Sequence, residues 1–110
     1  MAVEATRRWA GDGIVANPLN PGAIATNLQK HTGGLKTPPE RRKSPQQEAA
    51  TSVLLATSPL LERIGGRYFE DCNEARTVIR RPTDYVGVAR YALDSANAER
   101  RWNMSLSLIS

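Results

Sequence analysis

The sequence has only one cysteine, Cys72, and one histidine, His31, among its 110 residues. A lone cysteine forms no disulfide within the chain, and this Cys and His lack the close spacing of metal ligands. The absence of disulfides is typical of a reducing compartment. We therefore expect a cytoplasmic protein without a metal site.

Long hydrophobic runs are also missing. The longest apolar run, Val53 to Ala56, is far shorter than the roughly 20 residues that cross a bilayer. The first ten residues carry Glu4 and no apolar core, so they do not resemble a signal peptide. We expect no membrane partner.

Aromatic residues are few, with two Trp, three Tyr and one Phe, whereas the net charge is +4. A basic chain raises the question of nucleic acid, but such proteins usually cluster their cations and interleave aromatic side chains. Here the cations lie in separate groups, namely Arg7-Arg8, Arg41-Arg42-Lys43, Arg80-Arg81 and Arg100-Arg101. A nucleic-acid binder is therefore the least favoured hypothesis, and a salt series would test it.

The hydrophobic spacing predicts three helices. The first covers residues 2–10 and ends at Gly11-Asp12-Gly13. The second runs from 45 to about 57, with Ser44 as its cap and Gln47 placed for a capping box. Its expected inner stripe is Ala49, Ala50, Val53, Leu54 and Thr57. The third helix covers 95–108.

Two short strands are predicted, over 14–19 and 67–71, and residues 72–92 read as irregular. The first strand is mostly apolar, as in a parallel sheet that is covered on both faces. Two parallel strands alone would leave two exposed edges. The predicted fold class is therefore α/β, as an incomplete part of a doubly wound parallel sheet with about two strands and three helices.

The stretch "NPLNPGAIAT" resembles a strand-end motif, N-x-x-x-P-G-x-[IV]-x-T, of the short-chain dehydrogenase/reductase family. Asn17, Pro21, Gly22, Ile24 and Thr26 fill it in register. "EATRRWAGDGI", "SPQQEAATS" and "GGRYFEDCNEA" occur in the order of the family. The closing "GVARYALDSANAERRWNMS" is similar to retinol-dehydrogenase-like and WW-domain-oxidoreductase-like members. The resemblance implies that residues 1–110 form one C-terminal segment of an incomplete Rossmann-like fold.

The resemblance also implies a cofactor, NAD or NADP, and assigns residues to it. The Pro21-Gly22 turn would lie beside the nicotinamide. The backbone of Ile24 would bind the carboxamide, and the hydroxyl of Thr26 would bind the carboxamide or the phosphates. Glycine permits the close approach of a flat ring to the backbone.

Residues 27–43 correspond to the family's substrate lid, which would place Leu28 and His31 near an alcohol or carbonyl substrate. Long loops of this kind are often functional. His31 has a second interpretation, as a solvated loop residue, and we keep both.

The catalytic residues of the family are absent from the sequence. No T-G-x-x-x-G-x-G turn, catalytic serine or Tyr-x-x-x-Lys pair is present, and the residues four positions after Tyr68, Tyr85 and Tyr91 are Cys72, Ala89 and Ser95. Without a tyrosine acid/base and its lysine, the proton of hydride transfer has no carrier. We therefore predict no catalytic residue in this chain and no activity when it is alone.

Pro18 is a departure from the motif, because it lacks the N–H that a central strand needs. An alternative hypothesis is a non-catalytic interaction or oligomerisation module. In the family the segment that matches residues 45–71 often makes subunit contacts, so the partner would be a second copy or a full-length relative.

Overall fold

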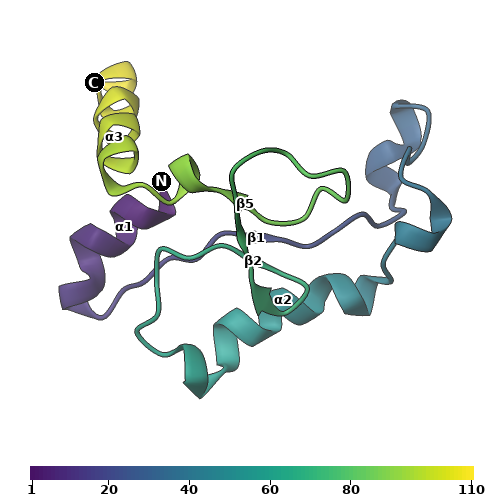
Figure 1. The fold of residues 1–110 in the computed structure, drawn as a ribbon, viewed down its shortest axis with the longest axis horizontal. Helices are drawn as coiled ribbons and strands as arrows, with labels where there is room; N and C mark the ends of the chain where they lie inside the picture. Colours follow the sequence, from purple (N-terminus) through teal and green to yellow (C-terminus); the bar gives the residue numbers. More distant parts are fainter.

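The computed structural model describes residues 1–110 and contains the three predicted helices (Figure 1). They are α1 (Ala2–Trp9), α2 (Pro45–Thr57) and α3 (Ser95–Ile109). Figure 1 places α1 and α3 together at one end of the molecule, with the loop after β1 at the other end. None of the helices combines the length and apolar character that a bilayer crossing requires.

The strands are short and form two small sheets. β1 (Leu19–Asn20) pairs in parallel with β2 (Phe69–Glu70), and β2 pairs in antiparallel fashion with β3 (Asn73–Glu74). β4 (Thr77–Val78) and β5 (Val88–Ala89) form a separate parallel pair. The chain is an α/β fragment with a partial Rossmann-like arrangement, as predicted.

The strand boundaries differ from the prediction. The strand expected over 14–19 begins only at Leu19, because Pro18 has no N–H for the ladder and joins it only through its carbonyl, which accepts from the Phe69 N–H at 3.0 Å. Residues 72–92, expected to be irregular, contain β3, β4 and β5. Two-residue strands are too short to show an alternating pattern, so hydrophobic periodicity does not predict them.

The predicted inner stripe of α2 was wrong for three of its five residues. Ala49, Val53 and Thr57 are exposed, whereas Thr51 is buried against the turn between β2 and β3. This helix is therefore oriented by a polar contact with a turn that is distant in sequence, rather than by an apolar stripe.

The chain covers little of its own surface. Only seven residues are buried, and the apolar ones are Ile24, Phe69, Ala75, Val88 and Ala98. The accessible surface is 8390 Å², whereas a compact monomer of 12.1 kDa exposes roughly 6,000 Å². The radius of gyration is 16.0 Å, against about 13 Å for a compact domain of this length. The fold therefore lacks the core of a self-contained domain.

Candidate functional site

A cavity of about 700 Å³ lies at the carboxyl ends of the parallel strands β1 and β2. Asn20 and Glu70, the last residues of the two strands, both line it, and so does Gly22. Open α/β sheets bind their ligands at this end of the strands, and the volume lies within the usual range for small-molecule sites. We refer to it as the strand-end cavity.

Of the Pro21-Gly22 turn, Gly22 lines the strand-end cavity. The N–H of Gly22 donates to Asn20 Oδ1 at 3.0 Å, and Gly22 has a φ of 98°. A Cβ at this position would lie 2.7 Å from Cδ of Lys43. The backbone angle therefore favours glycine here, whereas the end of the flexible Lys43 side chain could move aside.

Ile24 and Thr26 do not line the strand-end cavity. The Ile24 side chain is buried, and its backbone N–H donates no hydrogen bond within the chain. The Thr26 hydroxyl accepts from the Leu28 N–H at 3.2 Å and lines a separate hollow of about 380 Å³, together with Gly33 and Gly34. The structure thus brings only part of the predicted cofactor set, Gly22, to the cavity.

The lid segment, residues 27–43, is a closed loop whose two ends meet beside the Pro21-Gly22 turn. Ala23 forms a bridge with Arg42, and the Lys43 N–H donates to the Ala23 carbonyl at 2.9 Å. Leu28 is 83% exposed and His31 is also exposed, and neither lines the strand-end cavity. These two predicted residues therefore face solvent in this structure.

Lys43 and Asp71 form an ion pair that joins the base of the lid segment to the turn between β2 and β3. Asp71 and Cys72 both have positive φ, of 50° and 59°. Thr51 of α2 stabilises the turn, because its hydroxyl accepts from the Cys72 N–H at 3.0 Å. Sequence reasoning missed this contact set, because its members come from three segments without a shared motif.

Tyr68 does not have the environment of an acid/base catalyst. Burial raises the pKa of Tyr68, and the carboxylate of Glu70 raises this pKa further. A catalytic tyrosine needs the opposite shift, which a neighbouring cation provides. In addition, no group of three His, Cys, Asp or Glu side chains is placed to hold a metal ion.

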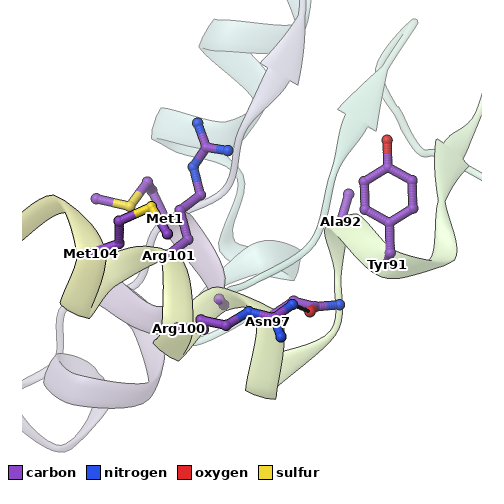
Figure 2. A pocket seen from close by; sticks show the side chains of 8 residues that line it. Met1, Tyr91, Ala92, Asn97, Arg100, Arg101 and Met104 are labelled. Carbon is purple, nitrogen blue, oxygen red and sulfur yellow. Dashed lines mark hydrogen bonds between the residues drawn. The ribbon is translucent and has the colours of Figure 1, made fainter.

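A second groove, of about 670 Å³, lies between the start of α1, residues 90–92 and α3 (Figure 2). Figure 2 shows Met1 and Met104 on one side and Tyr91 and Ala92 on the other, with Arg100, which donates to Asn97, below them. The groove shares no residue with the strand-end cavity. It is therefore separate from the candidate site.

Known proteins similar to this chain are oxidoreductases. A probable oxidoreductase of Streptomyces lividans is 48% identical, over 94% of this chain and 39% of the relative. The short-chain dehydrogenase/reductase prx1 of Penicillium roqueforti is 35% identical, over 100% of this chain and 35% of the relative. Human retinol dehydrogenase 14 is 33% identical, over 93% of this chain and 30% of the relative. No family model and no solved structure matches the chain.

The chain spans less than two fifths of the length of these relatives, although they cover nearly all of it. The order α1, β1, lid segment, α2 and β2 carries the family's motifs in the family's order. The chain therefore belongs to the short-chain dehydrogenase/reductase family, whose C-terminal portion it resembles.

Proposed function

We propose that residues 1–110 supply the nicotinamide side of an NAD- or NADP-dependent oxidoreductase that acts on alcohol or carbonyl substrates, and that the chain is inactive alone. The printed names of its relatives, which include a retinol dehydrogenase, support the reaction class. The position of Gly22 at the strand-end cavity supports the proposal that this chain contacts the nicotinamide end of the cofactor.

Within this proposal, Pro21 and Gly22 lie against the nicotinamide ring. The unpaired N–H of Ile24 is the donor for the carboxamide, and the Thr26 hydroxyl exchanges the hydrogen bond that it donates to Gln29 Oε1 for one to the cofactor. The lid segment with Leu28 and His31 then closes over the substrate. When bound, the dinucleotide supplies the hydride chemistry.

The chain offers no cradle for the pyrophosphate, since it has no glycine-rich turn that opens a helix. A few contacts near the nicotinamide do not offset the free energy of immobilising a whole dinucleotide. Tyr68, with a raised pKa, is no substitute for the missing acid/base tyrosine. These features support the proposed inactivity of the isolated chain.

The observation that carries the proposal is the uncovered surface. The accessible area of 8390 Å² exceeds that of a compact monomer by roughly 2,400 Å². Permanent interfaces bury areas of this order, from about 2,000 Å² upward. We infer that the remaining segments of the family fold cover this surface, with a strand beside the free edge of β1.

The test is an assay of the purified chain with NAD or NADP and a panel of primary and secondary alcohols, with a commercial NAD-linked alcohol dehydrogenase as positive control. The proposal predicts no reduced nicotinamide above the rate without protein. Turnover by the purified chain would overturn it.

A second candidate function is an interaction module, which the outer face of α2 favours. Val53 is 56% exposed and Leu60, just beyond the helix, is 84% exposed, and Ala49 and Ala56 lie on the same outer side. This function predicts a dimer in analytical ultracentrifugation that Val53→Glu converts to a monomer, whereas Asn103→Glu, at an exposed polar position on α3, leaves the dimer intact. A monomeric wild-type chain would contradict it.

A further inference from the structure

The acidic side chains around the strand-end cavity are all engaged by partners within the chain. Glu70 Oε1 accepts from the Gly87 N–H at 2.6 Å, and Asp71 pairs with Lys43. Asp84 Oδ2 accepts from Arg76 at 3.2 Å. Asp71 and Asp84 are therefore neutralised by cations, whereas Glu70, which only the backbone N–H of Gly87 contacts, keeps its negative charge.

Two cations that line the same cavity have no partner. Lys36 and Arg41 lie on the lid segment, are exposed, and form no ion pair or side-chain hydrogen bond. The third cation, Lys43, is neutralised by Asp71. The two positive charges on the side of the lid segment thus outnumber the one carboxylate of the cavity without an ion pair, that of Glu70.

Arg42 holds these two cations at the cavity. Its Nε donates to the Thr37 carbonyl at 2.8 Å, and its Nη2 donates to the Leu35 carbonyl at 3.1 Å. These bonds fold residues 35–42 into a tight loop, so Lys36 and Arg41 are brought to one wall. The charge arrangement is therefore built by the fold, although both side chains are at the surface.

The rest of the cavity wall suits the body of a small organic molecule. Pro38, Ala23, Val86 and the ring of Tyr85 supply apolar surface, and Asn20 supplies an amide. Arginine and lysine bind carboxylates and other anions through charge-assisted hydrogen bonds. The cavity thus combines an apolar wall with one cationic end.

We propose that the strand-end cavity selects an anionic substrate, an alcohol or carbonyl compound with an acidic group that Lys36 and Arg41 bind. This inference rests on the proposed oxidoreductase function and names the substrate class of that site. Because the two cations are solvated, each contributes modestly, and salt weakens the contribution.

The test compares an anionic probe, 4-(hydroxymethyl)benzoate, with its neutral methyl ester, which is one methyl group larger. Each is titrated into the isotope-labelled chain, and amide chemical shifts are followed. We expect the acid to shift the signals of Gly22 and Thr37 and to bind more tightly than the ester. Its affinity should fall at high salt. Lys36→Gln and Arg41→Gln should each lower the affinity for the acid by about two- to fivefold, in keeping with exposed ion pairs.

Arg90→Gln is the matched control, because Arg90 is exposed, forms no ion pair and does not line the cavity. It should leave the affinity unchanged, and the amide spectra of all three variants should overlay that of the wild type. Equal binding of acid and ester, no binding of either, or shifts confined to the groove at Arg100 and Arg101 would each overturn the proposal.

The outcomes also separate this inference from the proposed function. If both probes bind equally, the substrate class is wrong while the family role stands. If the purified chain oxidises alcohols by itself, the proposed inactivity fails, whereas the preference for the acid is measured independently of turnover.

Discussion

The hydroxyl of Thr51, in the middle of α2, accepts a hydrogen bond at 3.0 Å from the backbone N–H of Cys72. Cys72 and its neighbour Asp71 both hold positive φ, a conformation that costs non-glycine residues free energy. The bond from Thr51 stabilises this turn, and the turn in turn presents Asp71 to Lys43 at the base of the lid segment. One helix residue thereby positions a wall of the strand-end cavity.

Replacement of Thr51 by valine should destabilise the chain by about 1–3 kcal/mol, because it leaves the Cys72 N–H without its acceptor in a part-buried place. Urea unfolding followed by circular dichroism measures the loss. Thr51→Ser retains the hydroxyl and should retain most of the stability. If valine and serine behave alike, the hydrogen bond does not hold the turn.

Gly65 should not tolerate alanine. A Cβ there would lie 2.6 Å from the Thr6 side chain and 2.7 Å from that of Val15, so the packing of α1 on the chain must shift. Overpacking of this kind typically costs about 1–3 kcal/mol. Gly11→Ala is the control, since no atom lies within 4 Å of a Cβ at Gly11. Equal midpoints of thermal unfolding for the two variants would refute this account of the packing.

The stability of α1 should fall in acid because of Glu4. Hydrogen bonds from Arg7 and Arg8 lower the pKa of this fully buried carboxyl below its ordinary value. The ionised Glu4 contributes its full stabilisation above the pKa of the unfolded chain, about 4.3. This stabilisation is lost as the pH falls through the lower pKa of the folded chain. Circular dichroism of wild type and Glu4→Gln across acidic pH measures the effect. The glutamine variant should lose this pH dependence, and an unchanged profile would contradict the assignment.

The contact between α1 and α3 should depend on Trp102. Its ring meets that of Trp9 edge to face at a centroid distance of 5.5 Å, and the Arg8 guanidinium lies 5.1 Å from the Trp102 ring. Trp102→Leu should remove the aromatic term, worth about 0.5–1.5 kcal/mol, and raise hydrogen exchange in α3. Leu108→Ala, at an 80% exposed position, is the control. Unchanged exchange in the Trp102 variant would show that the pair does not hold α3.

Local signals in the sequence predict the helices well. The capping box forms as expected, with the Ser44 N–H donating to Gln47 Oε1 at 2.8 Å and the Gln47 N–H to Ser44 Oγ at 3.2 Å. The buried face of α2 could not be predicted, because it is set by a turn 21 residues away from Thr51. Likewise, the start of β1 at Leu19 reflects the missing N–H of Pro18, which joins the ladder through its carbonyl alone.

The candidate site was only partly accessible to sequence reasoning. The motif around Pro21 and Gly22 draws attention to the turn, and Gly22 does line the cavity. Lys36 and Arg41 carry no motif, and they reach the cavity only because Arg42 folds the lid segment back on itself. Tertiary contacts of this kind leave no periodic pattern.

We propose that this chain is one part of a dinucleotide-dependent oxidoreductase and works only when the other part is present. The most direct test is a titration with reduced dinucleotide, followed by its fluorescence. The samples are the chain alone, the portion of the Streptomyces lividans relative that the chain does not match, and a mixture of both. The account predicts saturable binding in the mixture alone. Binding and turnover by the isolated chain, or no binding in a mixture that associates, would contradict it.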